Sequence, residues 1–323
     1  MSENVAHILS IDLGGTQMRA ALYQAGDFVQ VTRVATLTYS EQGATAIIAR
    51  LIDLARTALP DGITPSAIGI AAPGPLDPRT GVVMHSFALP GWDHVPLGAQ
   101  ISAAFGGVSV ALENDANCAA LAEYALGAGR QADPLIYLTL STGIGGGVVF
   151  NGRLFTGWSG LAAEPGHMQF TDQAGVVRRL EELASGTGIA RLATERLPHY
   201  SGETALRGLP TLDGAAVGNA AVAGDAFALE VVRLAGTYLG LGLVNLFHVW
   251  SPQAVILGGS VTQLGDLLLD VVRQTVHDRI LNPLFIPPNW LRLAQFGSDV
   301  CLLGAAVNAA QHFTKSPSRS FSQ

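Results

Sequence analysis

The sequence contains a strand–glycine turn–strand pattern twice, and this repeat limits the folds that the chain can adopt. The first copy, HILSIDLGGTQMRAALY, covers residues 7–23, and the second, LIYLTLSTGIGGGVVFNGRLF, covers residues 135–155. In each copy two apolar runs flank a short glycine-rich segment, which is typical of two antiparallel strands joined by a tight turn. The repeat therefore predicts two α/β halves of one common plan, each opened by such a hairpin.

The segments after the first hairpin predict a mixed sheet flanked by helices. An alternating run over residues 28–39 predicts a third antiparallel strand, and apolar residues at helical spacing predict a helix over residues 44–59. Residues 66–77 predict a buried strand that ends in a Pro-Gly-Pro turn, and residues 108–129 predict a strand, a turn and a helix.

The second half continues with helices and a buried strand. We expect helices over residues 180–197 and 227–246, a linker-like segment over residues 202–223, a buried strand over residues 254–261 and an amphipathic C-terminal helix over residues 301–313. The polar tail that begins at residue 314 is expected to be disordered.

One uncharged stretch has the length of a membrane span. Residues 234–265 contain no Asp, Glu, Lys or Arg, but they do contain Asn245, His248, Pro252 and a Gly258-Gly259 pair. A membrane helix needs about 20 consecutive apolar residues. A buried helix, a turn and a buried strand explain this stretch better, so we expect no membrane partner.

Composition excludes several classes of protein. The 323 residues suggest two domains, and 49% hydrophobic residues supply ample core. The net charge is −7, from 18 basic and 25 acidic residues, whereas a nucleic-acid-binding protein needs a basic face. Cys118 and Cys301 are too few for a disulfide framework or a cysteine-rich zinc site. The N-terminus lacks the pattern of a signal peptide, so the expected location is the cytoplasm.

The two glycine turns are candidate phosphate sites. There is no P-loop motif, and no G-x-G-x-x-G opens a helix after the first strand. Asp12 ends the first strand before Gly14-Gly15-Thr16, and a denser run, Ser141 to Gly147, follows the later strand. An ordinary hairpin turn would explain the first run alone, but glycine N–H groups beside hydroxyls also form nests suited to phosphate. A carboxylate near phosphate groups makes sense if Mg²⁺ lies between them.

Two further motifs contain candidate catalytic and binding side chains. In ENDANCAALAE, residues 113–123, either Asn114 or Asp115 caps the following helix, and an ionised aspartate there could also act as the general base for an alcohol. In GLAAEPGHMQF, Glu164 and His167 flank a predicted turn at Pro165-Gly166, and the H-E-x-x-H pattern of a metalloprotease helix is absent.

These features together resemble the ROK family of sugar kinases and related sugar-responsive repressors, within the actin-like ATPase superfamily. The motifs that carry the resemblance span nearly the whole chain in the family's order: DLGGT (12–16), PGPLD (73–77), LPGW (89–92), ENDANCAALAE (113–123), STGIGGG (141–147), NGRLFTG (151–157), EPGH (164–167), LEELASG (180–186) and LGGSV (257–261).

The resemblance implies a two-domain α/β fold of the actin-like ATPase (ribonuclease H-like) type, with a ligand cleft between the domains. A smaller N-terminal domain is expected over residues 1–112, completed by the C-terminal helix in residues 302–323. A larger domain is expected over residues 113–301.

The resemblance also implies the roles of individual residues. Asp12 would orient Mg²⁺ and its waters, and Asp115 would be the general base. The residues that would hold phosphate are Gly14, Gly15, Thr16, Thr142, Gly143 and Gly145. Gly258 and Gly259 would approach the adenosine. The residues that would bind the sugar are Asn114, Asp115, Glu164, His167 and Glu181.

The function implied by the resemblance is transfer of the γ-phosphate of ATP to a hexose hydroxyl, with glucose as the expected sugar. The alternative sugars are N-acetylhexosamines, mannose, allose and fructose, and a further alternative is a sugar-sensing member that does no catalysis. The repressors carry a helix-turn-helix domain before the DLGGT strand, for which the residues ahead of His7 leave no room. The expected cofactors are ATP and Mg²⁺, and the expected assembly is a homodimer.

The sequence departs from the family's pattern in two places. Between His167 and Glu181 the family usually has a C-x-C-G-x-x-G-C segment, whereas this chain has a shorter segment without cysteine, so we expect no zinc site. We expect Phe170, Val176 and Val177 to hold that segment by apolar contacts. Ala88 stands where the family often has Asn, which affects hydrogen bonding near the expected sugar site.

Overall fold

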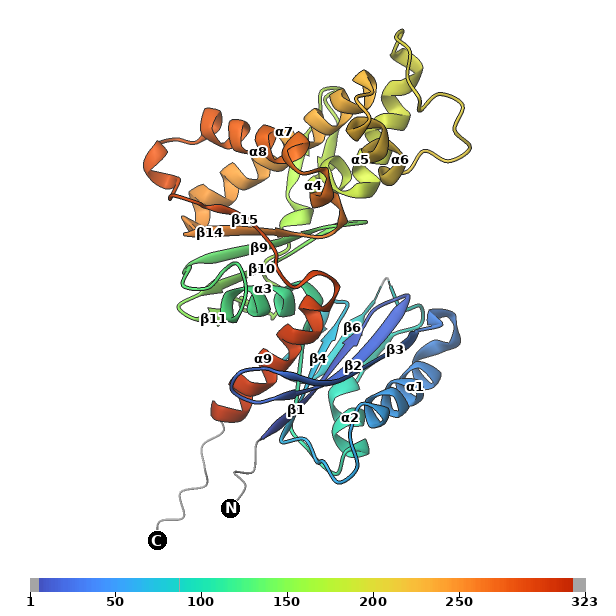
Figure 1. Ribbon diagram of the computed structural model, residues 1–323, viewed down its shortest axis with the longest axis vertical. Coiled ribbons are helices and arrows are strands. Elements are labelled where there is room, and N and C mark those ends of the chain that lie inside the picture. Colours follow the sequence, from blue (N-terminus) through green and yellow to red (C-terminus); the bar gives the residue numbers. More distant parts are fainter. Residues whose placement is uncertain (1–5, 87, 316–323) are drawn as a thin grey trace. The chain divides into compact units, whose positions relative to one another are not determined.

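The computed structural model describes residues 6–86 and 88–315, and these form two compact units (Figure 1). Unit 1 comprises Met1–Gly127, Thr156–Ala162 and Ser298–Gln323, and unit 2 comprises Ala128–Phe155 and Ala163–Gly297. The expected boundary after residue 112 differs from this division. Helix α3 (Asp115–Ala125), which that boundary assigned to the larger domain, packs against α9 (Val300–Lys315) and lies in unit 1.

Unit 1 is built on a five-stranded sheet with the order β3-β2-β1-β4-β8. Its strands are β1 (His7–Leu13), β2 (Gln17–Gln24), β3 (Gln30–Leu37), β4 (Ala67–Ala72) and β8 (Val110–Asn114). Strands β1, β2 and β3 pair antiparallel, whereas β1, β4 and β8 pair parallel. The expected run of three antiparallel strands is therefore confirmed.

Helices cover both faces of this sheet. On one face, α1 (Gly43–Thr57) and α2 (Leu97–Ala104) pack over Leu9, Ile11 and Leu13 of β1. On the other face lies α9, where the Ser10 hydroxyl donates to the Leu302 carbonyl. A small sheet of β5 (Leu76–Asp77), β6 (Val82–His85) and β7 (Asp93–Val95) completes the unit.

Two glycines let α9 approach the neighbouring backbones closely. A Cβ on Gly69 of β4 would overlap the Ala305 carbonyl oxygen, and a Cβ on Gly304 of α9 would overlap the Cys118 carbonyl oxygen. The C-terminal helix thus packs backbone against backbone on both β4 and α3, with Cys118 buried between them.

Unit 2 repeats the plan of unit 1. Its sheet has the order β11-β10-β9-β14-β15. As in unit 1, if the five strands of the sheet are numbered in sequence order, they lie in the order third, second, first, fourth and fifth. The strands are β9 (Leu135–Leu140), β10 (Ile144–Phe150), β11 (Arg153–Leu154), β14 (Ala254–Gly258) and β15 (Leu291–Leu293). Strands β9, β10 and β11 pair antiparallel, and β9, β14 and β15 pair parallel. The repeated plan predicted from the two hairpins is confirmed.

The helices of unit 2 differ from the prediction in two places. Expected helix 180–197 is two helices, α4 (Leu180–Ala184) and α5 (Gly186–Arg196), because Ser185 is extended and caps α5. The segment expected to be a linker contains α6 (Gly214–Val222), which the Asp213 side chain caps. The other helices are α7 (Ala226–Trp250) and α8 (Asp266–Arg279), and a hairpin of β12 (Gln169–Thr171) and β13 (Val177–Arg179) precedes α4.

The uncharged stretch forms the end of α7, a turn and β14, as predicted. Helix α7 is long and apolar enough to cross a membrane, but 67% of its most apolar window is buried inside the protein. Its buried face, including Phe227, Leu239 and Phe247, forms the centre of the unit 2 core. Helix α7 is therefore a core helix. The tail from residue 316 on lies outside the described residues.

Short 3-10 helices connect several elements: Ser40–Gln42, Pro165–His167 (η2), Leu197–His199, Ser260–Leu264 (η4), Pro283–Phe285 and Gly297–Asp299.

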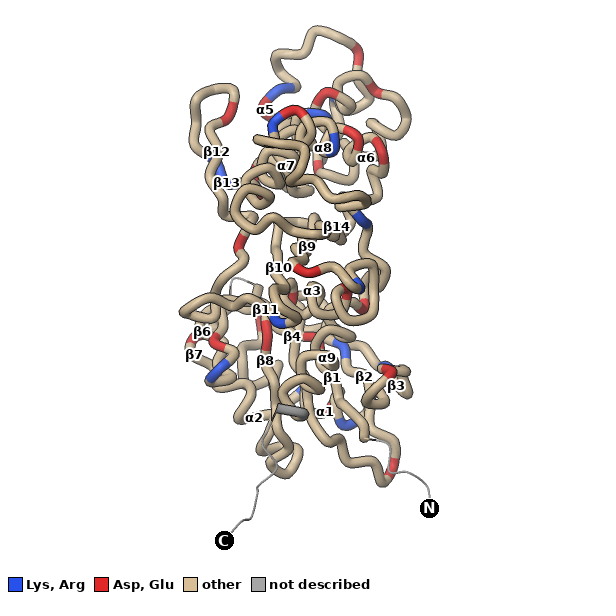
Figure 2. Tube along the Cα trace, turned by 90° about the vertical axis from the view of Figure 1, so that its left-hand side faces the viewer, with Lys and Arg blue, Asp and Glu red and all other residues tan. Residues whose placement is uncertain are grey.

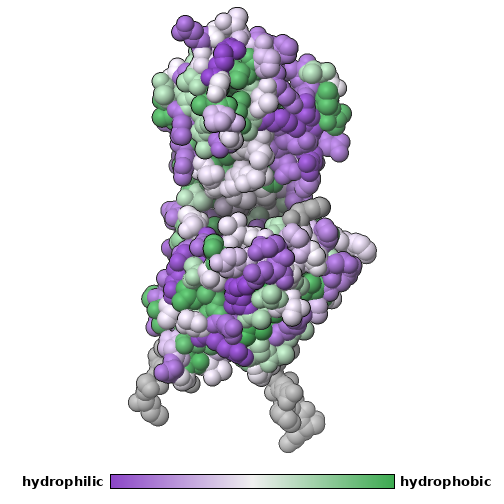
Figure 3. Space-filling view, turned by 90° about the vertical axis from the view of Figure 1, so that its right-hand side faces the viewer, coloured by the Kyte–Doolittle hydropathy of each residue, from purple (hydrophilic) through white to green (hydrophobic). Residues whose placement is uncertain are grey.

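Charged residues are sparse along the chain trace (Figure 2). On the face shown in Figure 3, hydrophobic residues are scattered among hydrophilic ones.

The close approach of α9 to α3 generates a stability prediction. Gly304→Ala places a methyl group against the Cys118 carbonyl, so we expect the free energy of unfolding to fall by about 1–3 kcal/mol, the usual cost of overpacking. Gly218→Ala on α6 is the matched control, because its Cβ would meet only the flexible tip of Leu264 at 3.3 Å. Urea unfolding measures both variants, and equal midpoints would contradict the predicted backbone contact.

Candidate functional site

In unit 1 the predicted site residues gather at one edge of the sheet. Asp12 lies near the end of β1, and Asn114 is the last residue of β8. Strands β1, β4 and β8 are parallel, so their carboxyl ends share this edge, with Asp12 opposite Ala71 and Ala72 opposite Asn114. Two strand spacings separate β1 from β8, which is roughly 10 Å. The fold therefore brings the predicted magnesium carboxylate and the predicted base to neighbouring positions.

Asp12 is buried and forms an ion pair that the sequence analysis missed. The Arg19 guanidinium donates to Asp12 Oδ2 at 2.7 Å and also to the Ser298 carbonyl at 3.1 Å. Burial raises the pKa of Asp12 to about 6, although Arg19 acts to lower it and Asp115 acts to raise it further. Asp12 and Arg19 face each other in the β1–β2 register, so the hairpin pattern could have revealed the pair.

The Gly14–Thr16 turn is hydrogen-bonded to Thr38, the residue that follows β3. The Thr38 hydroxyl donates to the Gly14 carbonyl at 2.6 Å, and the Thr38 N–H donates to the Thr16 carbonyl at 2.8 Å. Thr38 is fully buried, whereas Thr16 is exposed. The turn thus has a fixed backbone with Thr16 exposed on it, which is compatible with the predicted phosphate contact. No motif in the sequence singled out Thr38.

Gly15 lies against the segment that contains Ala88. A Cβ on Gly15 would come within 2.9 Å of the Ala88 carbonyl oxygen and 3.2 Å of its Cβ. The departure from the family's Asn at this position therefore lies directly beside the predicted phosphate turn.

The structure decides which residue caps α3. Asn114 is the N-cap, and its Oδ1 accepts from the N–H groups of Ala116 at 2.9 Å and Asn117 at 3.3 Å. Asp115 is the first residue of the helix, and its Oδ1 accepts from the Ala116 N–H at 2.7 Å. Burial raises the pKa of Asp115 above the usual range of an aspartate. A carboxylate in this setting can bind a proton more tightly than a solvated one.

A buried glutamate lies immediately before this pair. Glu113 is 3% exposed, and its Oε1 accepts from the Asn114 N–H at 2.9 Å and from Asn117 Nδ2 at 3.0 Å. Burial raises the pKa of Glu113. Glu113 therefore joins the strand end to the first turn of α3 and fixes the backbone that holds Asn114 and Asp115. Glu113 is part of the ENDANCAALAE motif, but the sequence did not indicate that it would hydrogen-bond to Asn114 and Asn117.

In unit 2 the glycine run is mostly strand rather than turn. The turn is limited to Ser141–Gly143, and Gly145 lies in β10 opposite Thr139 of β9. A Cβ on Gly146 would lie 2.5 Å from Pro165 Cγ, and a Cβ on Gly166 would overlap the Ile144 carbonyl oxygen. The run is therefore one short turn followed by a strand, and phosphate binding by Thr142, Gly143 and Gly145 stays a prediction. Its later glycines let the EPGH segment pack on β10.

This packing positions the three predicted sugar-binding residues of unit 2. Glu164 and His167 are exposed at the two ends of η2, and Glu181 is half-buried in the first turn of α4. Strand β10, η2 and α4 are in mutual contact. Oε2 of Glu181 lies 2.9 Å from the position of a Cβ on Gly143. A predicted sugar ligand thus lies beside the predicted phosphate turn.

A pocket of about 470 Å³ in unit 2 opens beside that turn. Its lining residues come from the turn, α5, α6 and η4: Ser141, Thr142, Gly186, Thr187, Ile189, Ala190, Asp213, Gly214, Ala215, Gly218, Asn219, Val222, Ser260, Val261, Gln263 and Leu264. The Thr187 hydroxyl donates to the Thr142 carbonyl at 2.6 Å and so links α5 to the turn. Six of these residues, from Asp213 to Val222, were missed because α6 lies in the segment expected to be a linker.

Gly258 and Gly259 adjoin this region, but the reason for glycine there is packing. A Cβ on Gly258 would overlap the Tyr137 hydroxyl, and a Cβ on Gly259 would overlap the Leu140 carbonyl oxygen. Gly259 also has a φ of 90°, which favours glycine. Among the residues that line the pocket are Ser260 and Val261, which directly follow this pair.

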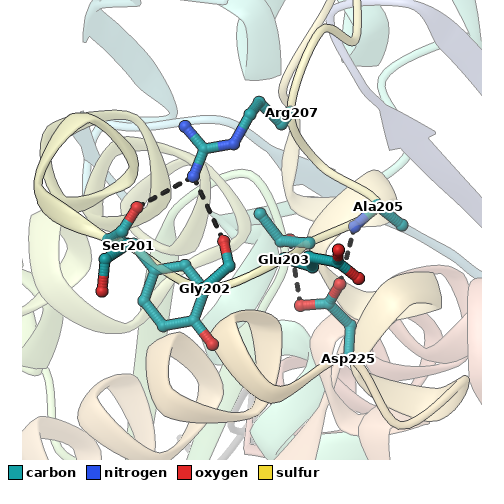
Figure 4. A pocket seen from close by; sticks show the side chains of 8 residues that line it. Ser201, Gly202, Glu203, Ala205, Arg207 and Asp225 are labelled. Carbon is teal, nitrogen blue, oxygen red and sulfur yellow. Dashed lines mark hydrogen bonds between the residues drawn. The ribbon is translucent and has the colours of Figure 1, made fainter.

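A second polar pocket lies in the loop between α5 and α6 and contains none of the predicted residues (Figure 4). Two of its charged side chains, Asp225 and Arg207, have partners within the loop. Asp225 accepts from the Thr204 hydroxyl at 3.0 Å and the Ala205 N–H at 2.8 Å, and Arg207 donates to the carbonyls of Tyr200 and Gly202. These bonds hold the loop to the start of α7, so the pocket is explained by loop structure.

The segment expected to be held by apolar contacts is held by both apolar contact and charge. Phe170 packs against the unit 2 core, as expected. Val176 and Val177 are 47% and 61% exposed, so the predicted apolar contacts are wrong for these two residues. Asp172 closes the β12–β13 hairpin by accepting from the N–H groups of Ala174 and Val176 and from Arg178. Across residues 6–86 and 88–315, no three His, Cys, Asp or Glu side chains converge as metal ligands.

Comparison with known proteins gives consistent matches along the chain. The family model described as the ROK family matches residues 8–312. A glucokinase from Thermotoga maritima is 34% identical over 93% of this chain and 96% of its own length. The crystal structure of a ROK hexokinase from Thermus thermophilus has a TM-score of 0.78 at 33% identity, covering 95% of this chain and 99% of its own. A Streptomyces griseus ROK glucokinase in complex with glucose and AMPPNP has a TM-score of 0.77 at 30% identity, covering 95% and 100%.

Other relatives are not named glucokinase. A bifunctional NanE/NanK enzyme from Brucella melitensis is 32% identical over 95% of this chain, which spans 54% of that enzyme. A beta-glucoside kinase from Listeria monocytogenes is 29% identical over 79% of this chain and 83% of its own length. These matches agree on the kind of enzyme and differ in the sugar.

Proposed function

The chain belongs to the ROK family, and we propose that it is a glucokinase with Asp115 as its general base. As a hexokinase-type phosphotransferase with the actin-like ATPase fold, it uses a sugar and ATP. The choice of glucose is supported by the relative named glucokinase at 34% identity and by the glucose complex of the Streptomyces griseus enzyme. The observation that carries the proposed mechanism is the placement of Asp115 beside the buried Asp12 at one sheet edge.

The proposed base is suited to its task by its position. Asn114 caps α3, and Glu113 accepts from the Asn114 backbone N–H. The Asp115 side chain is therefore not needed as the helix cap. Its pKa is raised by burial, which brings proton affinity closer to that needed to accept a proton from an alcohol. In the proposed reaction Asp115 accepts the proton of the sugar hydroxyl while Asn114 hydrogen-bonds a neighbouring hydroxyl.

The remaining binding roles follow the two hairpin turns. In unit 1, Gly14, Gly15 and Thr16 would hold phosphate through N–H groups and a hydroxyl. In unit 2, Thr142 and Gly143 would do the same, and the pocket beside them would take the adenosine next to Gly258 and Gly259. Gly145 lies within β10, so its proposed contact would come from the strand end. Glu164, His167 and Glu181 would bind sugar hydroxyls.

The residues present fit a magnesium ion. Asp12 accepts from Arg19 through Oδ2, which leaves Oδ1 for a water of the ion, and Mg²⁺ commonly binds through one carboxylate, waters and substrate phosphates. The ion would supply charge neutralisation on the transferring phosphate. No zinc ion is proposed.

A different sugar remains the second candidate, because N-acetylmannosamine-type and beta-glucoside kinases are also relatives. Coupled ADP release over a panel of glucose, mannose, allose, fructose, N-acetylhexosamines and a beta-glucoside tests the proposal. We expect the highest kcat/KM with glucose. A higher value with any other sugar would replace glucose and leave the kinase class intact.

Dimerisation, cytoplasmic location and the lack of a nucleic-acid or membrane partner stay predictions. Light scattering on the purified protein measures the assembly directly.

Replacing the proposed base should abolish turnover and leave the fold intact. In Asp115→Asn the amide oxygen can still accept from Ala116, but it cannot accept the hydroxyl proton, so we expect kcat to fall about 10²–10⁴-fold. Asp225→Asn is the matched control, because Asp225 also accepts N–H groups at a helix start but lies outside the proposed site. Asp115→Asn with more than about a tenth of wild-type kcat at saturating glucose would rule out the base.

The rate should depend on pH in the direction set by Asp115. Only the ionised carboxylate accepts a proton, and burial raises its pKa, so kcat/KM should fall as the pH drops, beginning above the ordinary aspartate range near about 4. The residual rate of Asp115→Asn should lack this acid limb. An acid limb of the same midpoint in both proteins would assign the titration to another group.

The enzyme should work without structural zinc, because the hairpin is closed by Asp172 and Arg178 rather than by cysteines. Elemental analysis of protein purified without chelator should show zinc well below one ion per chain, and activity lost on chelation should return with Mg²⁺ alone. Near-stoichiometric zinc, or recovery that requires zinc, would contradict this prediction.

A further inference from the structure

Seven charged side chains form an unbroken chain of ion pairs along one side of unit 2. In order they are Asp172, Arg178, Glu195, Arg191, Glu182, Arg179 and Glu181. Negative and positive groups alternate at every step, and they come from the β12–β13 hairpin, α4 and α5. The inner end of this ion-pair chain is Glu181, a proposed sugar ligand. The outer end is the tip of the hairpin.

The outer end is fixed by backbone and charge together. Asp172 Oδ1 accepts from the Ala174 and Val176 N–H groups, both at 2.9 Å, and Oδ2 accepts from Arg178 Nε at 2.6 Å. Arg178 Nη2 then donates to Glu195 of α5 at 3.1 Å. The hairpin is therefore tied to α5 through a side chain that is only 21% exposed.

The middle of the ion-pair chain connects α5 to α4. Arg191 Nη1 donates to Glu182 Oε1 at 3.0 Å, and its Nε lies 3.6 Å from Glu195 Oε1. Arg191 also donates to the Glu182 carbonyl. Glu182 in turn accepts from the Arg179 N–H at 2.8 Å and from Arg179 Nε at 3.3 Å. Arg179 is thus held by both its backbone and its side chain.

At the inner end Arg179 meets the proposed sugar ligand. Its Nη1 lies 2.9 Å from Glu181 Oε1, while Glu181 Oε2 lies beside Gly143. The Glu181 carboxylate is therefore confined between a guanidinium and the backbone of the predicted phosphate turn. A flexible glutamate side chain loses entropy when a ligand orders it, and a partner that orders it beforehand reduces that cost.

The pairs that Arg179 makes are too exposed to matter much for stability. The Arg179 and Glu182 side chains are 45% and 32% exposed, and isolated pairs of this kind contribute little to folding because water screens them. Their shared effect is geometric, since each arginine contacts two carboxylates and so fixes one relative to the other.

We propose that Arg179 is a positioning residue for sugar binding, which orients the Glu181 carboxylate and is itself anchored through the ion-pair chain to the β12–β13 hairpin. This inference rests on the proposed sugar kinase function. It assigns the cysteine-free segment between His167 and Glu181 the task of presenting Glu181.

Arg179→Met removes the charge and keeps the side-chain length. With glucose and ATP as the probes, we expect the KM for glucose to rise about tenfold, the effect of losing one charge-assisted contact, while kcat and the KM for ATP change less than about twofold. Arg179→Lys should recover part of the glucose KM. Arg273→Met is the matched control, because Arg273 is also 45% exposed and pairs with Asp266 and Asp270 on α8; it should leave all three constants unchanged.

Asp172→Asn tests the anchoring at the far end of the chain, and it should raise the glucose KM in the same direction by a smaller factor. Should Arg179→Met not fold, as judged by circular dichroism, Arg179→Lys and Asp172→Asn provide the test. Equal increases in the KM for glucose and the KM for ATP would show a general structural role and overturn the proposal. An unchanged KM for glucose would also overturn it. Wild-type protein that phosphorylates no sugar in the panel would overturn the proposed function and this inference together.

Discussion

Close packing of backbone against backbone is the constraint on which the rest of the structure depends. In unit 1 it occurs where α9 meets β4 and α3, at Gly69 and Gly304. In unit 2 it occurs where η2 meets β10, at Gly166 against the Ile144 carbonyl, while Gly146 makes room for the Pro165 ring. Only glycine permits these approaches, and each one fixes an element that carries proposed site residues. Part of the high glycine content of the chain, 38 of 323 residues, therefore serves packing.

The proposed site combines carboxylates that the fold treats differently. Asp12 is buried beside Arg19, and burial raises its pKa to about 6, whereas Asp115 lies at a helix N-terminus whose cap is the neighbouring Asn114. Separating the cap from the carboxylate leaves Asp115 available for chemistry. On unit 2, Glu181 is held by Arg179, so its orientation depends on the ion-pair chain rather than on burial.

Several local features could be predicted because they depend on neighbours in the sequence. The hairpins, the buried strand β14 and the start of α3 follow from residue period, glycine and capping residues within a few positions. The prediction failed where distant residues compete with local preference. Residues 180–197 have helical spacing throughout, yet the helix is interrupted at Ser185. The N–H of the next residue, Gly186, donates to the distant Ser141 carbonyl at 2.7 Å. The apolar contacts expected of Val176 and Val177 gave way to the Asp172–Arg178 pair.

The sequence by itself determined the repeated plan of the two halves, the family resemblance and the identity of the candidate residues, because each is recorded in a local motif. Only the tertiary structure decided that Arg19 pairs with Asp12, that Thr38 holds the Gly14–Thr16 turn, and that Gly146 leaves room for Pro165. It also decided that α6 helps to form the pocket beside Thr142. These facts depend on contacts between segments far apart in the chain, and side-chain type alone does not record which distant backbone or charge a residue will meet.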